Sequence, residues 1–592
     1  MMRALAATGL TVVLSLTIAL SGAAPSAAIT IYTVLGHVTD ATTGAPIEGV
    51  CIIIGPPAAC PPTAPMSNAT GDWTTQLVSG ADWDVWYSKT GYALVKDTIP
   101  ASNATDPYRL SKALTPVVTP PPGTCAAANT ATPTQTVYLP NITKTLGGAT
   151  GFQTPFIVQN TGTVATNLEV SFYKFSDGSC VTRRTINTVA AGTSFADVPN
   201  NDSDLPGDSQ FSVVVRSFGA SIVSVVNEHA GVGDRAEALS YDGFSAGAMT
   251  VSLPNIVRRF FGFHTPFIIQ NLGTTSTMAT ASFLPFGGGS AVTVTRTIAP
   301  GQSQFIEPNV ETVLQDGKQY GVTVTASQPI AVVVNTHNDD PSVAAPVAYA
   351  TNGVTSGAPS VFGPYAAKNA NDQGFMSTVS TIVVQNVGQA QVQPTLTFTP
   401  LGGGTSKTFT APTPLAAGAS WAFDPRYENG AAGTTLCGSA ATTPCLADGE
   451  YSFVAAAPGS LAAAVNVVSP TTAMGYTGIG RAATSFFLPN VTRTLGGASG
   501  WTTPILLQTV TASGAAVQWR RFSDGQLVLT QTVNAAAGTG LRIDPRTVVG
   551  LTDDTQYAVT VTGTGGTVAA IVTELNFTGG DGAMIYEGFA AP

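Results

Sequence analysis

A long segment occurs four times in succession along this chain. LPNITKTLGGATGFQTPFIVQ, which begins at Leu139, returns as LPNVTRTLGGASGWTTPILLQ from Leu488, with 13 of 21 positions identical. Two more divergent copies lie between these two. The matching position of the four copies is held by Gln159, Gln270, Gln385 and Gln508, which are separated by 111, 115 and 123 residues. The blades of a β-propeller repeat at about 40–50 residues. The longer period therefore predicts that each copy is a separate domain.

Each copy consists of short strand-like runs bounded by turn residues. One matching stretch contains DSQFSVVVRS, GKQYGVTVTA, DGEYSFVAAA and DTQYAVTVTG, in which turn residues open an alternation of β-branched or aromatic residues. About seven or eight such runs fit in a copy, and almost no segment has the 3.6-residue period of an amphipathic helix. The pattern predicts an all-β chain of antiparallel, immunoglobulin-like β-sandwiches. In general pattern the copies resemble bacterial immunoglobulin-like surface-protein domains.

The segment that precedes the four copies lacks their motifs. The run GHVTDATTGAPIEGVCIII begins at Gly36, NATGDW follows at Asn68, and SGADWDVWYSKTGYALV starts at Ser79. These runs resemble the carboxypeptidase regulatory-like family, whose motif positions are matched here by Gly36, Val38, Asp40, Thr43, Gly44, Pro46, Ile47, Gly49, Val50, Gly71, Trp73, Gly91 and Tyr92. The resemblance implies a small transthyretin-like or carbohydrate-binding-like β-sandwich. The family pattern has no catalytic residues to carry over, and a shared fold does not define a function.

The domain boundaries follow from the repeats and from composition. The expected parts are a signal peptide at 1–28, a small sandwich at 29–115, a Pro-rich linker at 116–135, and repeats at 136–246, 247–357, 358–482 and 483–592. Four prolines stand at 116, 120, 121 and 122 near the start of the linker, and such segments are extended and semi-rigid. Because each sandwich is expected to have its own core, we expect four repeats in a rod that presents the small first domain.

The N-terminus has the three parts of a secretory signal. Met1-Met2-Arg3 is followed by an apolar run from Leu10 to Leu20 and by small residues that end near Ala28. After this signal no stretch reaches the roughly 18 apolar residues of a membrane-spanning helix. The sequence therefore predicts a secreted, extracellular or cell-surface protein without a transmembrane segment after signal cleavage.

The charge of the chain is low and acidic. Only 10% of the 592 residues are charged, and the formal net charge is −10. Without a basic field the chain is not expected to bind nucleic acid. We attribute the low charge to strands whose water-facing side carries Thr, Ser and Gln. Partners are therefore expected among extracellular glycans or surface proteins, while the oligomeric state stays open.

Six cysteines form an even set, as is typical of an exported chain. Their spacing favours local pairs between Cys51 and Cys60 and between Cys437 and Cys445, which leaves Cys125 for Cys180. The sequence alone permits 15 pairings. A zinc site is the competing interpretation, but no C-x-x-C motif is present.

Two places carry residues suited to binding. In NNDSDLPGD, Asp202, Asp204 and Asp208 lie in a turn-rich loop and could supply oxygen ligands to calcium, the one cofactor considered; a solvated acidic loop is the alternative. In the first domain, alternation along ADWDVWYS places Val85 toward the core and Trp86 with Asp84 on the opposite face. Trp86 and Asp84 are the glycan-stacking candidates, and packing against a loop or the linker is the alternative.

Catalytic motifs are weak. GFSAG around Ser245 matches the nucleophile-elbow pattern, but that turn requires a strand followed by a helix, and here another β unit follows. His229 and His337 occupy the same repeat position, so we expect strand-end histidines in separate domains and no paired metal site. The leading hypothesis is a non-enzymatic, structural or adhesive extracellular protein. The alternative is a carbohydrate-binding accessory protein of a polysaccharide-acting system.

Overall fold

The computed structural model describes residues 31–591 except 42–43, 56–59, 62, 90–91, 93–94, 102–105, 115–124, 339–344, 373–374 and 441–443. The predicted signal peptide and the four linker prolines lie outside the described residues. The chain forms two compact units, one up to residue 119 and one from residue 120. The described helices are short 3-10 turns, namely η1 (Pro199–Asn201), η2 (Gly233–Arg235), η3 (Glu428–Gly430) and η4 (Pro545–Thr547). The prediction of an all-β chain with antiparallel sheets is confirmed.

The first unit is a small sandwich of two three-stranded sheets, β3-β1-β6 and β2-β4-β5. Its strands are β1 (Ile31–Asp40), β2 (Cys51–Ile54), β3 (Asp72–Val78), β4 (Trp83–Ser88), β5 (Val95–Ile99) and β6 (Tyr108–Leu114). β1 and β6 pair in parallel, so in this unit the expected antiparallel sandwich is found only in part. Every second residue of β1 is buried, as expected for a strand with one face on a core. In β4 Val85 and Tyr87 are buried, and Trp86 lies on the opposite face, as the alternation predicts.

The second unit contains the four copies, called repeats 1 to 4 below. Repeats 1 and 4 each fold into two separate antiparallel sheets: β10-β9-β12-β7 with β11-β8-β13-β14, and β33-β32-β35-β30-β38 with β34-β31-β36-β37. The strands of repeat 1 are β7 (Gln135–Lys144), β8 (Phe156–Asn160), β9 (Thr166–Lys174), β10 (Cys180–Val189), β11 (Ser194–Asp197), β12 (Ser209–Ser217), β13 (Ile222–Ala230) and β14 (Glu237–Asp242). Those of repeat 4 are β30 (Ser485–Arg493), β31 (Ile505–Thr509), β32 (Gly514–Arg521), β33 (Leu527–Asn534), β34 (Thr539–Ile543), β35 (Thr555–Gly563), β36 (Val568–Leu575), β37 (Ala583–Glu587) and β38 (Phe589–Ala590).

In repeats 2 and 3 one long strand takes part in both sheets and joins them. The strands of repeat 2 are β15 (Ala248–Arg258), β16 (Phe267–Asn271), β17 (Thr277–Pro285), β18 (Val292–Ile298), β19 (Ser303–Ile306), β20 (Lys318–Asn338) and β21 (Val347–Asn352). Those of repeat 3 are β22 (Ala358–Lys368), β23 (Ala370–Asp372), β24 (Phe375–Asn386), β25 (Thr395–Pro400), β26 (Lys407–Thr410), β27 (Ser420–Phe423), β28 (Gly449–Val468) and β29 (Ala473–Thr477). The first half of β20 pairs with β15 and β17, and its second half pairs with β16 and β21.

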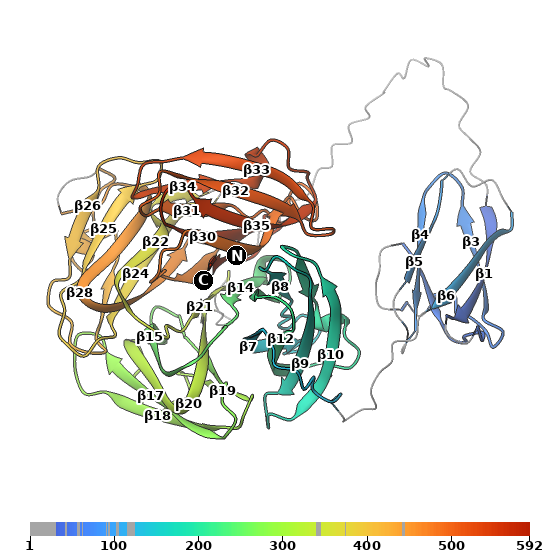
Figure 1. Ribbon diagram of the computed structural model, residues 1–592, viewed down its shortest axis with the longest axis horizontal. Helices are drawn as coiled ribbons and strands as arrows, with labels where there is room; N and C mark the ends of the chain where they lie inside the picture. The colour runs from blue at the N-terminus through green and yellow to red at the C-terminus, as the bar shows by residue number, and fades with distance from the viewer. Residues whose placement is uncertain are drawn as a thin grey trace, which may run out of the picture. The chain divides into compact units, whose positions relative to one another are not determined.

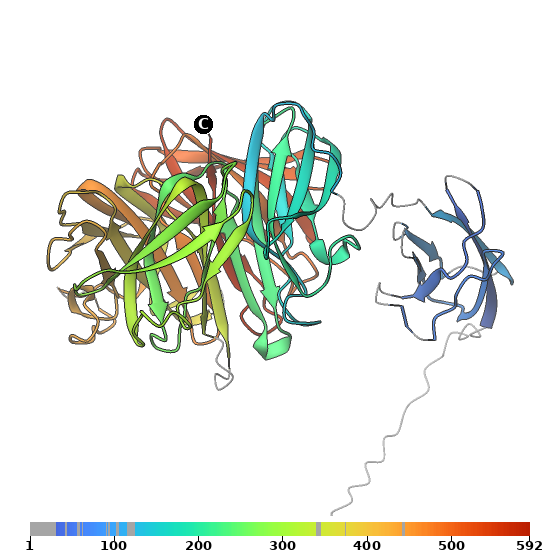
Figure 2. The ribbon, with the colours of Figure 1, turned by 90° about the horizontal axis from the view of Figure 1, so that it is seen from below.

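The four repeats are arranged in a closed ring (Figures 1 and 2). The strands β14, β21, β29 and β37 occupy the same place in their repeats, and each contacts the equivalent strand of both neighbouring repeats. Repeat 4 thereby contacts repeat 1. The predicted rod is wrong, because the edge strands of the sandwiches face one another around a common axis instead of stacking end to end.

The hydrophobic cores are also shared between repeats. Ile268 and Val333 of repeat 2 belong to the cluster of buried side chains that fills repeat 1. One larger cluster fills repeats 3 and 4 and includes Ile157 and Val225 of repeat 1. The expectation of a separate core is confirmed for repeat 2, whose own cluster runs from Val251 to Val334, and is wrong for repeats 3 and 4, which share one cluster. Apolar side chains also cover the surfaces between repeats. We call each surface between neighbouring repeats a seam, and the one between repeats 4 and 1 the closing seam.

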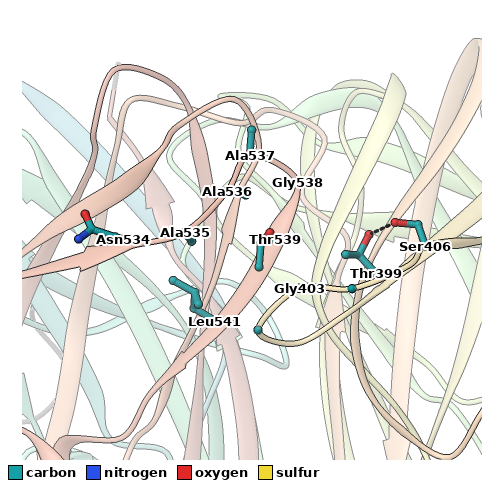
Figure 3. Close-up of a pocket in the computed structure, with 12 residues that line it drawn as sticks. Thr399, Gly403, Ser406, Asn534, Ala535, Ala536, Ala537, Gly538, Thr539 and Leu541 are labelled. Atoms are coloured by element: carbon teal, nitrogen blue, oxygen red, sulfur yellow. Dashed lines mark hydrogen bonds between the residues drawn. The ribbon is translucent and has the colours of Figure 1, made fainter.

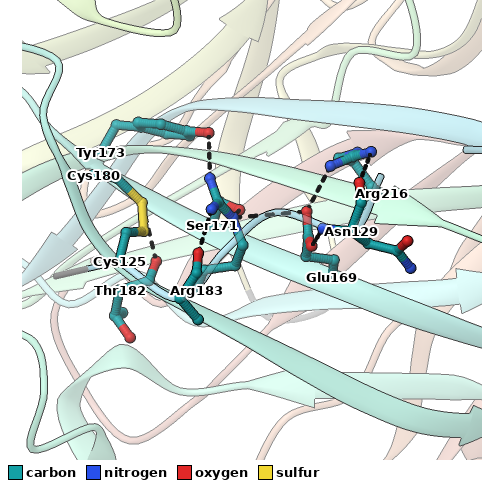
Figure 4. The surroundings of a disulfide bond; sticks show 10 residues. Cys125, Asn129, Glu169, Ser171, Tyr173, Cys180, Thr182, Arg183 and Arg216 are labelled. Atoms are coloured by element: carbon teal, nitrogen blue, oxygen red, sulfur yellow. Dashed lines mark hydrogen bonds and ion pairs between the residues drawn. A yellow bond between two sulfur atoms is a disulfide. The ribbon is translucent and has the colours of Figure 1, made fainter. Parts of the chain in front are cut away.

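The predicted linker is shorter than expected, because its last part is fixed to repeat 1. A disulfide joins Cys125 to Cys180 on β10 (Figure 4). Arg216 Nη2 donates hydrogen bonds to the carbonyl oxygens of Asn129, at 2.9 Å, and Ala131, at 3.3 Å. Buried Glu169 accepts a hydrogen bond from the Asn129 N–H at 2.6 Å and pairs with Arg216 at 2.8 Å. The chain from residue 125 onward thus belongs to the ring unit.

Candidate functional site: the ring axis and the seams

One position of each repeat meets its equivalents at the ring axis. This position directly precedes a glycine at the end of the axis-facing strand, and its residues are Asp242, Asn352, Thr477 and Glu587. Asn352 Nδ2 donates to the Asp242 carbonyl oxygen at 2.7 Å, and Thr477 Oγ1 donates to the Asn352 carbonyl oxygen at 2.8 Å. Glu587 accepts the Thr477 N–H, and its carboxyl group adds to burial in raising the pKa of Asp242. The contacts run once around the axis and return to repeat 1.

Asp581 contacts several repeats at the start of their axis strands. Its carboxyl group accepts the N–H groups of Ala348, at 2.7 Å, and Ala473, at 3.0 Å, and also that of Ala583. Its own N–H donates to the Ala236 carbonyl oxygen at 2.8 Å. These four partners lie in repeats 2, 3, 4 and 1. Burial raises the pKa of Asp581 well above its ordinary value, although the N–H donors oppose that shift.

The repeated LPN motif supplies a second kind of contact between repeats. Proline has no N–H, and the strand pairing shifts register beside Pro140, Pro254 and Pro489. Each proline carbonyl accepts a hydrogen bond from a serine of the following repeat. The pairs are Ser303 with Pro140 at 2.8 Å, Ser420 with Pro254 at 2.9 Å, and Ser194 with Pro489 at 3.1 Å. In repeat 4 Gly540 holds the serine position, so the seam between repeats 3 and 4 lacks this bond.

The repeated glutamines lie at the same seams. Gln159, Gln270, Gln385 and Gln508 are at most 2% exposed. Gln385 Nε2 lies 3.4 Å from the Val322 carbonyl oxygen of repeat 2, and Gln508 Nε2 lies 3.4 Å from the Phe453 carbonyl oxygen of repeat 3. The expectation that the uncharged polar side chains all face water is therefore wrong for these glutamines, because neighbouring repeats cover them.

Two glutamates are buried beside the axis. Glu228 accepts hydrogen bonds from Asn141 Nδ2 at 2.7 Å and from Asn335 Nδ2, across the seam to repeat 2, at 3.1 Å. Burial raises the pKa of Glu228 to about 8. In repeat 4, Glu574 bonds to Asn490 and, across the closing seam, to Asn227; burial raises its pKa to about 7. Both carboxyl groups are held by amides, without a cationic partner among the groups that shift their pKa.

His229 and His337, near the ends of strands β13 and β20, contact aromatic rings of the preceding repeat. The His229 ring centroid lies 5.3 Å from that of Trp501 in repeat 4, and the His337 centroid lies 5.8 Å from that of Phe152 in repeat 1. His229 and His337 thus occupy different seams, as expected of residues in separate domains. Burial lowers the pKa of His229 to about 4, so its imidazole is neutral.

Sequence reasoning missed a histidine cluster at the seam between repeats 1 and 2. The ring centroids of His264 and His337 lie 5.6 Å apart. His264 Nδ1 lies 3.3 Å from a Glu307 oxygen, and His337 Nδ1 lies 3.6 Å from Glu237 Oε2. His264 holds the position of Gln153 in the recurring run before Thr-Pro, and only the folded chain shows that this position pairs with that of His337. Within the described residues no group of three or more His, Cys, Asp or Glu side chains is arranged to hold a metal ion.

The predicted calcium loop is organised around a lysine. Lys144 Nζ donates to the carbonyl oxygens of Asp202 and, at 2.8 Å, Leu205. The Asp202 carboxylate pairs with Arg184, and Asp208 Oδ1 accepts the Gly147 N–H at 2.9 Å. The structure therefore does not bring Asp202, Asp204 and Asp208 together as a ligand set, because an ammonium group already fills the loop.

Trp86 and Asp84, the predicted glycan-binding residues, both lie near Lys96 on the surface of unit 1. Lys96 Nζ lies 5.7 Å from the centroid of the Trp86 ring and 3.2 Å from Asp84 Oδ2. Thr98 Oγ1 donates to Asp84 Oδ1 at 2.8 Å, and this bond holds the pKa of Asp84 below its ordinary value. Trp86 remains partly exposed. Ser245 lies on an exposed bend that leads into β15, so the helix of a nucleophile elbow does not follow it.

The three disulfides of the described chain join Cys51 to Cys60, Cys125 to Cys180 and Cys437 to Cys445. Two of them are the local pairs favoured by the spacing, and Cys125–Cys180 is the pair that then remained. Two of them close short loops, and the third fixes the segment that enters repeat 1. No helix in the described part of the chain has the length and apolar character needed to cross a membrane.

Two hollows lie at seams. One of about 380 Å³ separates the glycine turn 402–404 of repeat 3 from residues 534–539 of repeat 4 and is lined by uncharged groups (Figure 3). At the equivalent place between repeats 1 and 2, Gln302 Nε2 donates to the carbonyl oxygens of Phe175 and Ser176, each at 3.0 Å. The second, of about 180 Å³, lies at the closing seam beside His229, Trp501 and Glu574.

Comparisons with known proteins do not assign the chain to a family. No family model and no curated protein matches it, so the resemblance of the first unit to carboxypeptidase regulatory-like domains stays a prediction. Among solved structures, the alignment with the major pilin subunit BcpA of Bacillus cereus covers 75% of this chain and 89% of the BcpA chain, with 7% identity and a TM-score of 0.13. The RrgB pilus protein of Streptococcus pneumoniae covers 62% and 74%, with 10% identity and a TM-score of 0.14. A Thermotoga maritima protein covers 18% and 93%, with 19% identity and a TM-score of 0.16. TM-scores this low do not show that the domains of this chain are arranged as in these proteins.

Proposed function

We propose that this chain is an exported, non-enzymatic protein with a structural or adhesive role, in which the four-repeat ring is a rigid body that carries the small N-terminal sandwich. The observation that supports this proposal best is the use made of the repeated residues. The recurring serines, prolines and glutamines bond one repeat to the next. A motif repeated for catalysis would instead place reactive groups in a cleft.

The compartment is inferred from the disulfides. Three pairs lie in the described chain, with at least one in each unit. Disulfides persist in oxidising surroundings and are rare in the cytosol. Together with the signal-like N-terminus, they support a secreted or cell-surface location, where the ring and the small sandwich would contact surface proteins or glycans.

A second candidate function is that of a carbohydrate-binding accessory protein. Two observations favour it: the partly exposed Trp86 and the hollow at the seam between repeats 3 and 4. The hollow is lined by hydroxyl, amide and backbone groups, among them Thr399, Ser406 and Asn534, and such groups suit a neutral polyol. Against it, Lys96 already lies near the Trp86 ring, which limits stacking of a sugar.

One binding experiment separates the two. The full chain is applied to intact cells of the producing organism and to an array of neutral and acidic polysaccharides, and its self-association is followed by analytical ultracentrifugation. Trp86→Ala is the test variant, and Phe261→Ala, which removes an aromatic ring that is 84% exposed in repeat 2, is the matched control.

Attachment to cells or self-association that is unchanged in Trp86→Ala, without polysaccharide binding, supports the structural role. Polysaccharide binding that Trp86→Ala removes and Phe261→Ala leaves intact supports the accessory protein instead. Turnover of any polysaccharide on the array would refute the proposal that the chain has no enzymatic activity.

A further inference from the structure

The hollow at the closing seam is built by two repeats together. Its wall includes Ala196 and His229 of repeat 1 and Trp501, Gln556 and Glu574 of repeat 4, and its volume is about 180 Å³. Ala196 is exposed, so the hollow reaches the surface of the ring beside this residue. A molecule that enters the hollow from outside would therefore touch repeats 4 and 1 at once.

Glu574 carries the one carboxyl group of this wall, and one of its oxygens lacks a donor. The residue is 1% exposed. Asn490 Nδ2 donates to Oε1, and the amide of Asn227 also lowers the pKa of the carboxyl group from across the seam. The second oxygen, Oε2, is buried and has no hydrogen-bond partner within the described residues. A buried acceptor of this kind is costly unless a donor reaches it.

The donors nearest to Glu574 are directed to other oxygens. Gln556 Nε2 donates to Asn490 Oδ1 at 2.6 Å, and the Asn490 amide in turn donates to Glu574 Oε1. The hydroxyl groups of Thr492 and Thr503 both donate to main-chain carbonyl oxygens, at 2.9 and 3.4 Å. A ligand in the hollow would therefore have to bring the donor for Oε2 itself.

The equivalent carboxyl group between repeats 1 and 2 is fully satisfied by the protein. Glu228 holds the position of Glu574, and Asn141 Nδ2 donates to its Oε1 at 2.7 Å. Asn335 Nδ2 donates to its Oε2 across the seam at 3.1 Å. Because the motif residues are the same at both seams, the unsatisfied oxygen is a particular feature of the closing seam and not of the repeated motif.

The other groups of the wall favour a cation with an apolar chain. No lysine or arginine lines the hollow, and burial lowers the pKa of His229 to about 4, so its imidazole is neutral and repels no positive charge. An ammonium group forms its strongest hydrogen bonds with a carboxylate and is attracted to the face of an indole ring, which Trp501 can supply. Apolar side chains complete the wall, namely Pro155, Ile157 and Leu495.

We propose that the hollow at the closing seam binds a primary ammonium group on a short hydrocarbon chain, with Glu574 Oε2 as its acceptor and Trp501 as its aromatic wall. A free alkylamine and the lysine side chain of a partner protein both carry this group. The site goes beyond the proposed structural role and does not depend on it, because it is formed by the ring alone.

The binding should strengthen with rising pH, because only the ionised carboxyl group attracts a cation. Burial raises the pKa of Glu574 to about 7. Glu574 in turn raises the pKa values of Asp242 on β14 and Tyr586 on β37, so these groups keep their protons while Glu574 ionises. On β11, the Asp197 carboxylate pairs with Arg184 at 2.7 Å. Since an alkylammonium ion stays charged below pH 10, the affinity should fall about a hundredfold between pH 8 and pH 5.

Calorimetric titration of the full chain with n-butylammonium chloride, at pH 8 and pH 5, tests the site. n-Butanol replaces the ammonium group by a hydroxyl group and is the neutral control, and an acetylated and amidated Gly-Gly-Lys-Gly-Gly peptide presents the same group as a lysine side chain. Glu574→Gln removes the charge, and Glu228→Gln makes the same change at the satisfied site as the matched control. Ala196→Leu narrows the exposed entrance and provides the test if Glu574→Gln fails to fold.

We expect butylammonium to bind at pH 8, to bind about tenfold or more weakly in Glu574→Gln and in Ala196→Leu, and to bind unchanged in Glu228→Gln. Binding of butylammonium without the peptide supports a free amine as the ligand, and tighter binding of the peptide supports a lysine side chain. Binding of neither probe, as in a hollow that takes up only water, would overturn the proposal. Equal binding of butanol, an affinity that does not change with pH, or full binding in both Glu574→Gln and Ala196→Leu would overturn it as well.

Discussion

Replacing Asp581 by alanine tests whether the ring depends on its axis. The carboxyl group of Asp581 is 1% exposed and accepts the N–H groups of Ala348 and Ala473, at 2.7 and 3.0 Å. These two residues begin the axis strands β21 and β29. Alanine retains the main-chain bond to the Ala236 carbonyl oxygen but removes every side-chain acceptor.

The magnitude follows from the groups left without partners. Three buried N–H groups, those of Ala348, Ala473 and Ala583, lose their acceptor. Each unsatisfied group costs about 1–3 kcal/mol, so the free energy of unfolding of the ring unit should fall by about 3–9 kcal/mol. Asp581→Asn should lie between wild type and alanine, because the amide retains one acceptor oxygen but turns a second donor toward an N–H group.

Urea denaturation followed by circular dichroism and by tryptophan fluorescence measures the change. The control is Asp524→Ala in repeat 4, where an exposed aspartate pairs with Arg521 at 3.1 Å and accepts the Gln526 N–H at 3.1 Å. The exposed ion pair is worth about 0–1 kcal/mol. If the free energies of unfolding of Asp581→Ala and of this control differ by less than about 0.5 kcal/mol, the Asp581 contacts at the axis do not stabilise the ring.

Two further predictions concern packing and covalent links. A Cβ at Gly475 would lie 2.3 Å from Tyr349 Cδ2 across the seam between repeats 2 and 3, so Gly475→Ala should destabilise the ring by about 1–3 kcal/mol in thermal unfolding; Gly438→Ala, with no atom within 4 Å, should not. Serine replacement of the Cys125–Cys180 pair, 55 residues apart, should lower the free energy of unfolding by about 4 kcal/mol, against about 2.5 kcal/mol for Cys437–Cys445, 8 residues apart. Equal losses in either comparison would contradict the reasoning.

Local patterns along the sequence predicted the strands well. Alternation assigned Val85 and Tyr87 to a core, and the repeated turn residues separated the strands of every copy. These features depend on neighbouring residues in the chain, for which periodicity is a direct signal. Each strand position occurs in four copies, so an error in assigning one strand has little effect on the predicted fold.

The ring was not predicted, although the sequence contained a signal for it. Strands such as β8 and β13 are apolar on both faces and also carry Gln159 and Asn227, which are buried. An antiparallel sheet of an isolated sandwich leaves one face to water and shows simple alternation. Strands without a water-facing side therefore indicate that a neighbouring domain covers them, but they do not say whether the array closes or extends.

The candidate site depended on contacts between distant residues, and these were beyond sequence reasoning. His264 and His337 of repeat 2 meet Glu237 of repeat 1, and the axis position joins residues of all four repeats. In the predicted calcium loop, Lys144 binds carbonyl oxygens of the loop, and calcium binding there stays a prediction. Lys144 precedes the acidic loop by some sixty residues, so only the folded chain shows that it binds this loop.

The differences among the four repeats are what a closed ring of this kind requires. Open arrays need special end repeats, because the terminal units expose a surface that others cover; here repeat 4 covers repeat 1 instead. Identical residues at the axis position would place four equal side chains together. Asn352 and Thr477 instead each donate to the main chain of the preceding repeat, and Glu587 accepts the Thr477 N–H. Divergence at this position therefore gives each linked seam its own contact and fixes the order of the repeats.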